Sequence, residues 1–184
     1  MKKIILVTLI LVLVPCLGQA QSSDYSKGHG YVFGGAGGQT GQTYGGAGAH
    51  LGVGGESFLN RFVGVGGEVG YVGGSGRSAS DAFVLSPNFV ARFLAKDSKN
   101  KVEPFVTAGY SLFYHGETEA RINSGFGYSY FDVHRLRSGM NLGAGVNLWA
   151  SDRIGVRFEF RDYILLGDYG TIHFAGAHIG LTFR

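Results

Sequence analysis

The sequence contains a single cysteine, Cys16, which lies inside the N-terminal apolar segment. Without a second thiol, the remainder of the chain can form neither a disulfide framework nor a cysteine-based metal site. The histidines and acidic residues show none of the spacings typical of zinc sites either. Acylation of Cys16 in a lipoprotein is the alternative use of this thiol, but Val14 and Pro15 before it are unfavourable for that cleavage. We expect no metal and no cofactor.

Long apolar runs are missing after residue 21, where no stretch approaches the ~20 apolar residues that a transmembrane helix needs. The N-terminus has instead the order of a secretory signal peptide, with positive charges, a short apolar run and small residues. These are Lys2 and Lys3, Ile4 to Leu17, and Gly18 and Ala20. We therefore predict a signal peptide over residues 1–20, cleaved after Ala20, and a short leader over residues 21–28.

A large excess of charge of one sign is also absent. Removing the two lysines of the signal peptide from 16 basic residues leaves 14 against 13 acidic ones, a net charge of +1. The sequence therefore gives no reason to expect a nucleic-acid partner. Lysine is scarce after the signal peptide and is confined to Lys27, Lys96, Lys99 and Lys101.

Glycine and aromatic residues are abundant, with 33 glycines and 14% aromatics. Apolar and polar residues alternate with a period of two, which predicts β-strands with two unlike faces. Most blocks are about ten residues long, the length of a tilted strand that crosses a membrane. The predicted strands of one all-β domain over residues 29–184 are 29–38, 44–56, 62–72, 82–94, 104–115, 139–150, 153–165 and 173–184.

The predicted connections alternate in length. Segments 57–61, 95–103 and 151–152 are short or lysine-rich turns, whereas 73–81 and 116–138 are longer. Short turns at one rim and longer loops at the other are typical of outer-membrane barrels. This parity places both chain ends at the short-turn, periplasmic rim.

The two faces of the strands predict what meets lipid and what fills the lumen. A soluble lipocalin-like barrel is the alternative, but glycine on its water-facing surface would weaken the strands, and a soluble surface would scatter lysine widely. The predicted lipid-facing residues are Val63, Val65, Val156, Phe158, Phe160, Ile179, Leu181 and Phe183. The predicted lumen charge network is His50, Glu68, Arg92, Arg157, Glu159, Arg161 and His178. The predicted aromatic girdle includes Tyr71, Tyr114 and Tyr163, with Tyr31 and Tyr44 also near strand ends.

Three segments carry a resemblance to a known family: residues 141–147, residues 156–163 and the closing Gly180-Leu-Thr-Phe183. They resemble the small outer-membrane β-barrels of the OmpA-like and OmpX-like group. The resemblance implies an eight-stranded, antiparallel, up-and-down transmembrane β-barrel in the bacterial outer membrane. It also implies contact with outer-membrane lipid and lipopolysaccharide, and insertion by the assembly machinery that reads a C-terminal strand ending in an aromatic residue. Here that residue is Phe183, followed by Arg184.

We expect a structural or surface-interaction role rather than an enzyme, with the lumen plugged by the charge network. Eight strands leave an interior only wide enough for side chains, which disfavours an ion pathway. Segment 116–138, with the aromatic run Phe126 to Phe131, is a candidate contact surface for an extracellular ligand, but we favour the interpretation that the run extends the fifth and sixth strands and packs on itself. The resemblance also includes barrels that modify lipid A, so rim catalysis is an alternative. Its candidate residues are His115, His134 and His173, with Ser111, Glu117 and Asp132.

Overall fold

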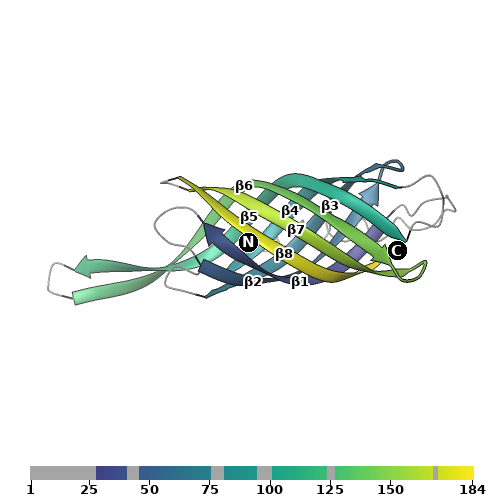
Figure 1. The fold of residues 1–184 in the computed structure, drawn as a ribbon. Helices are drawn as coiled ribbons and strands as arrows, with labels where there is room; N and C mark the ends of the chain where they lie inside the picture. The colour runs from purple at the N-terminus through teal and green to yellow at the C-terminus, as the bar shows by residue number, and fades with distance from the viewer. Residues whose placement is uncertain (1–27, 41–45, 76–80, 95–100, 124–126, 168–169) are drawn as a thin grey trace, which may run out of the picture.

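The computed structural model describes residues 28–40, 46–75, 81–94, 101–123, 127–167 and 170–184, and for residues 75, 117–134 and 167 it describes no side chain. Eight antiparallel strands form a closed barrel in which each strand pairs with the next and β8 pairs with β1 (Figure 1). The strands are β1 Gly28–Thr40, β2 Gly46–Phe58, β3 Val63–Ser75, β4 Ala82–Arg92, β5 Val102–Asn123, β6 Gly127–Trp149, β7 Ile154–Gly167 and β8 Gly170–Phe183.

Closure joins the two ends of the strand sequence. The β1–β8 pairing runs from Gly30 opposite Phe183 to Thr40 opposite His173. A closed sheet leaves no edge strand with unpaired N–H and C=O groups. The predicted eight-stranded antiparallel barrel is therefore confirmed, and β1 begins at Gly28, one residue earlier than predicted.

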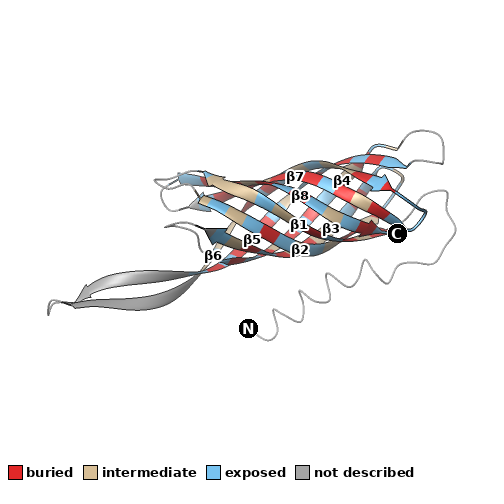
Figure 2. Cartoon of the chain, turned by 60° about the horizontal axis from the view of Figure 1, so that its bottom comes forward, coloured by how far each residue is buried: buried red, intermediate tan, exposed pale blue. Residues whose placement is uncertain are grey.

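The strands bury and expose their residues in alternation, as Figure 2 shows along most of the barrel wall. In β7, for example, Arg157 and Glu159 are buried while Phe158 and Phe160 are 42% and 58% exposed. Successive side chains of a strand point to opposite faces, so in this part of β7 the charged groups enter the barrel and the two phenylalanines face the exterior.

Side-chain caps fix the short turns. In the turn between β2 and β3, the side-chain oxygen of Asn60 accepts hydrogen bonds from the backbone N–H groups of Phe62 and Val63, both at 2.8 Å. The hydroxyl oxygen of Ser151 accepts corresponding bonds from Arg153 and Ile154 at 3.3 and 3.1 Å between β6 and β7. Such local bonds replace ladder partners in tight turns.

The predicted bounds of the fifth and sixth strands, 104–115 and 139–150, are wrong, whereas the favoured interpretation that the aromatic run extends these strands agrees with the pairing of residues 127–131. Beyond His115 and Gly139, where pairing with β4 and β7 ends, β5 and β6 continue to pair with each other as far as Asn123 opposite Gly127. This two-stranded extension, the β5–β6 ribbon, lies at the end of the barrel opposite the C-terminus (Figure 1). Its aromatic and β-branched residues favour strands. Beyond the barrel wall the two strands pair only with each other and enclose no lumen, so neither face must be continuously apolar and the alternation that marks the other strands stops early.

The β4–β5 ladder is interrupted at one place. Pairing runs to Leu85 opposite Leu112 and resumes at Asn88 opposite Gly109. Pro87 lies in the gap, and proline has no backbone N–H to donate.

Within the described segments, no helix is long and apolar enough to cross a membrane.

Candidate functional site

The barrel lumen holds the densest group of chemically active side chains in the described structure. It divides along the barrel axis into two parts. Near the short-turn rim lies the charged lumen segment, formed by His29, Glu56, Glu68, Arg92, Glu103, Arg157, Glu159 and Arg161. Toward the opposite rim lies the apolar lumen segment, formed by Val72, Ala82, Val84, Phe113, Tyr163, Leu165, Ile172 and Phe174.

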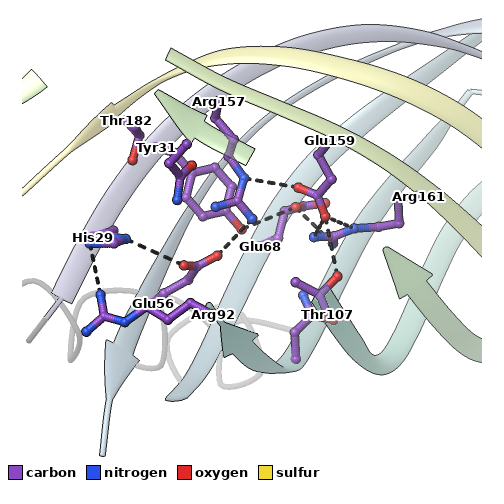
Figure 3. Close-up of polar contacts among 12 residues, drawn as sticks. His29, Tyr31, Glu56, Glu68, Arg92, Thr107, Arg157, Glu159, Arg161 and Thr182 are labelled. Carbon is purple, nitrogen blue, oxygen red and sulfur yellow. Dashed lines mark hydrogen bonds and ion pairs between the residues drawn. The ribbon is translucent and has the colours of Figure 1, made fainter. Parts of the chain in front are cut away.

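Arg157 occupies the centre of the charged lumen segment (Figure 3). Its guanidinium lies 2.8 Å from the carboxylate of Glu56 and 3.1 Å from that of Glu159. The rings of Tyr31 and Phe105 lie on it at 4.2 and 3.9 Å from ring centroid to guanidinium carbon. Two carboxylates and two aromatic faces thus replace the water that this cation loses on burial, and unpaired burial would be strongly unfavourable.

Arg161 forms the next layer toward the apolar part. It contacts Glu159 at 2.5 Å and Glu68 at 3.0 Å. The hydroxyl of Tyr163 donates a hydrogen bond to the other carboxylate oxygen, Oε1 of Glu68, at 2.9 Å, and that of Tyr31 donates to Oε2, the oxygen that Arg161 contacts, at 3.4 Å. Glu68 therefore connects the arginines to Tyr163, which also belongs to the apolar lumen segment.

Glu103 joins the network to the short-turn rim. Its carboxylate lies 3.4 Å from the imidazole of His29, 3.6 Å from Arg92 and 3.1 Å from Arg184. His29 also approaches Glu56 at 3.8 Å. The last residue of the chain, Arg184, thus contacts a buried carboxylate of β5, which ties the C-terminus to the opposite wall of the barrel.

Two more arginine–aromatic contacts lie at this rim. The guanidinium carbon of Arg92 is 3.5 Å from the ring centroid of Phe58, and that of Arg184 is 3.8 Å from the centroid of Trp149. The buried Arg92 and the half-buried Arg184 are thus each satisfied by the carboxylate of Glu103 together with an aromatic ring.

Glycine on the inner face makes room for these large groups. A Cβ atom added at Gly54 would meet the ring of Tyr31, and one added at Gly52 would lie 2.5 Å from the ring of Phe33. At Gly143 the same atom would lie 2.8 Å from Glu159. Because the inward glycines have no side chain, they leave the space that the aromatic and charged side chains occupy.

Rings dominate the apolar lumen segment. Tyr163 contacts Phe113 and Phe174 at centroid distances of 5.3 and 6.2 Å. Between the two segments lie His50 and His178, whose ring nitrogens approach to 3.1 Å. The interior thus changes from ion pairs to aromatic and aliphatic packing within the length of the strands.

All seven residues of the predicted lumen network lie inside the barrel, each no more than 6% exposed. Sequence reasoning missed other buried polar residues, chiefly His29, Glu56, Glu103 and Asn141. Several of these lie near strand ends. Extending the period-two pattern to those ends would have found them, because Glu56 shares the parity of His50 on β2.

The predicted exterior residues lie on the outer face. Seven are between 39% and 58% exposed, and Val156 is half-buried. Tyr71 and Tyr114 also face outward, at 37% and 46% exposure.

The assignment of Tyr163 to the outer girdle is wrong, because this side chain is 0% exposed and bonds to Glu68 inside the barrel. Tyr163 has the inward parity of Arg157 and Arg161. Tyr31 is likewise inside, at 3% exposure, and Tyr44 lies outside the described residues.

The structure separates the candidate catalytic residues of the rim. Ser111 and His115 are buried in the lumen, so neither faces the exterior. His173 does face outward, and its Nδ1 lies 2.9 Å from Asp162, a partner that sequence reasoning missed. The side chains of Glu117, Asp132 and His134 are outside the described part of the structure. Among the described residues there is no cluster of three metal-ligating side chains.

Residues 9–184 match the sequence profile of the outer membrane protein beta-barrel domain. The chain belongs to this family. Membership agrees with the closed barrel, its apolar exterior and its short turns at one rim, which in outer-membrane barrels is the periplasmic rim. Among curated protein sequences, none matches this chain.

Solved outer-membrane barrels share the fold. Neisserial surface protein A has a TM-score of 0.68 and 10% identity, covering 86% of this chain and 97% of that one. The outer membrane enzyme PagL has a TM-score of 0.58 and 19% identity, covering 82% and 97%. Ail, the attachment invasion locus protein of Yersinia pestis, has a TM-score of 0.51 and 12% identity, covering 86% and 99%. At these identities the likeness concerns the fold.

Proposed function

We propose that this outer-membrane barrel has a structural and surface-interaction role and that its lumen is closed to ions. The observation that carries the proposal is the serial arrangement of two different fillings in one narrow interior. An ion would have to break the contacts of Arg157 and Arg161 with their carboxylates and then pass the packed rings of the apolar lumen segment. Eight strands leave no room for a separate aqueous path.

The test is conductance in planar lipid bilayers. Purified protein, shown to be folded by its heat-dependent shift in electrophoresis, is expected to give no steady current. A double variant, Phe113→Ala with Phe174→Ala, opens the apolar lumen segment and serves as the comparison. Steady single-channel steps from the wild-type protein would contradict the closed lumen.

The surface role is supported by the β5–β6 ribbon, which extends beyond the pairing of both neighbouring strands. The aromatic run Phe126 to Phe131 lies in this segment. We infer that the ribbon contacts an extracellular ligand, as the attachment named for the similarly folded Ail also suggests. Replacing residues 117–137 with a short turn should lower attachment of expressing cells to immobilised matrix protein while the barrel still folds. Unchanged attachment of the cells would contradict the proposal that the ribbon binds an extracellular ligand.

We further propose that residues 1–20 are a signal peptide cleaved after Ala20, and that the chain then reaches the outer membrane through the assembly machinery and contacts its lipid and lipopolysaccharide. Residues 1–27 are outside the described structure. N-terminal sequencing of the protein from the outer-membrane fraction should begin at Gln21. A start at any other residue would exclude cleavage after Ala20.

A second candidate function is lipid modification at the outer rim. It is favoured by the outward pair of His173 and Asp162, which leaves Nε2 of the imidazole facing away from the carboxylate partner, and by the fold shared with the enzyme PagL. Overexpression should then change the mass spectrum of lipid A, and His173→Ala should restore it. An unchanged spectrum with the wild-type protein would exclude this candidate.

A further inference from the structure

A groove of about 340 Å³ lies on the exterior of the barrel, across β3 to β6. Its walls are the outward side chains of Val63, Phe89, Val106 and Leu142, and its floor is formed by small residues that include Ala91 and Ala108. The lining is apolar almost throughout. Six of the nine lining residues have the outward parity of their strands, which places the groove on the outside of the barrel wall, whereas Val90, Thr107 and Gly143 have the inward parity.

The strand register explains why the surface is hollow here. Val63, Ala91 and Val106 stand side by side on three neighbouring strands. In the next outward row Phe89, Ala108 and Leu142 do the same. Each row therefore has alanine between two larger residues. Strands are about 4.8 Å apart, so Phe89 and Leu142 stand about 10 Å apart across Ala108, a width that suits one hydrocarbon chain.

One end of the groove points to the short-turn rim, which carries cations. Arg61 lies in the turn two residues before Val63, and Lys101 precedes Val106 by five residues, about 16 Å along β5. The backbone at Arg61 is fixed, because its carbonyl accepts a hydrogen bond from the side chain of Arg92 at 2.9 Å. The nearest acid of β5, Glu103, points into the lumen.

Arg61 and Lys101 therefore place two cations beyond this end of the groove. The groove is thus an apolar channel that leads to a rim with more cations than anions. This combination matches an amphipathic molecule with a hydrocarbon chain and an anionic head.

We propose that the groove binds an acyl chain of an anionic phospholipid from the periplasmic leaflet, with the phosphate at Arg61 and Lys101. Any lipid-facing surface touches hydrocarbon, but a concave site next to two cations holds one molecule in one orientation. Guanidinium groups suit phosphate because their planar N–H groups bind it in a bidentate manner. The proposal depends on the outer-membrane location and not on a closed lumen, so the conductance experiment does not decide it.

The experiment uses the full mature barrel in nanodiscs of phosphatidylcholine and phosphatidylglycerol, followed by native mass spectrometry of lipid retained on the released protein. The wild-type protein should retain one phosphatidylglycerol in preference to phosphatidylcholine. Ala108→Leu fills the floor and should lower the retained lipid at least fivefold. The matched control is Ala177→Leu, which enlarges another exposed outward alanine on β8 and should retain lipid as the wild type does. Arg61→Gln should reduce the preference for phosphatidylglycerol while a lipid of either kind is still held.

Equal lipid retention by Ala108→Leu and Ala177→Leu would overturn the groove as the site. An unchanged phosphatidylglycerol preference in Arg61→Gln would overturn the placement of the phosphate. A dimer peak that disappears only in Ala108→Leu, with lipid retention unaltered, would mean that a second copy of the chain covers the groove instead. Heat-shift electrophoresis of each variant verifies that the barrel is folded before its spectrum is interpreted.

Discussion

The two lumen segments are built by the same strands and the same alternation, yet they are stabilised in different ways. In the charged lumen segment every cation faces more than one partner, as Arg157 does between Glu56 and Glu159. In the apolar lumen segment, contacts such as Phe113 with Tyr163 are non-directional. Removing one ion-pair partner leaves a buried charge without a counter-charge. Shortening an apolar side chain instead lowers the free energy of unfolding roughly in proportion to the volume removed. Stability therefore depends mainly on the chemical identity of the side chains in the charged lumen segment and mainly on their size in the apolar lumen segment.

The largest effect is expected for Arg157→Ala. The substitution leaves the buried carboxylates of Glu56 and Glu159 without this cation, and the free energy of unfolding should fall by about 3–5 kcal/mol. Urea unfolding in lipid vesicles, followed by the fluorescence of Trp149, measures it. Arg153→Ala, in an exposed turn, is the control and should change the free energy by no more than about 0.5 kcal/mol. Similar values for both variants would mean that the network contributes little.

A change of identity at constant size should also be costly in the charged lumen segment. Glu68→Gln keeps the shape but removes the charge that faces Arg161 and accepts from Tyr163. Charge-assisted hydrogen bonds contribute roughly 1.5–3 kcal/mol, so a loss of that order is expected in the same unfolding experiment. A neutral result would place the stabilisation in shape rather than charge.

Adding a single methyl group tests the packing between glycine and ring. Gly54→Ala forces the ring of Tyr31 to move, and overpacking costs about 1–3 kcal/mol. Gly30→Ala is the matched control on the neighbouring strand, because a Cβ there meets nothing within 4 Å. If both variants unfold at the same urea concentration, the inward glycines are not required for space.

The smallest effect is expected in the apolar lumen segment. Ile172→Val removes one buried methylene group and should lower the free energy of unfolding by about 0.5–1.5 kcal/mol. Its side chain is 3% exposed. A loss larger than that of Glu68→Gln would reverse the comparison between the two segments.

Much of the candidate site could be predicted from the sequence, because side chains along a strand point alternately into and out of the barrel. Arg157, Glu159 and Arg161 alternate with Val156, Phe158 and Phe160, and the structure places the two sets on opposite faces. The same rule would have placed Tyr163 inside. It was assigned instead from its nearness to a strand end, which says nothing about the face.

The bounds of the two strands in the β5–β6 ribbon were missed for a related reason, although strand extension is the favoured interpretation of the aromatic run. Its strands continue past the barrel wall, where neither face must be apolar, so the pattern that marks a membrane-crossing strand stops near His115 and Gly139. The backbone pairing from there to Asn123 and Gly127 needs only two extended segments and a connection.

The sequence by itself determined the number of barrel strands, the short turns at one rim and which residues point inward. Only the tertiary structure decided which inward residues meet. Arg157 pairs with Glu56, and Tyr163 with Glu68, across a lumen whose walls come from distant parts of the chain. Those meetings depend on the register of β8 against β1 and on barrel closure, which are global properties, whereas alternation is fixed residue by residue.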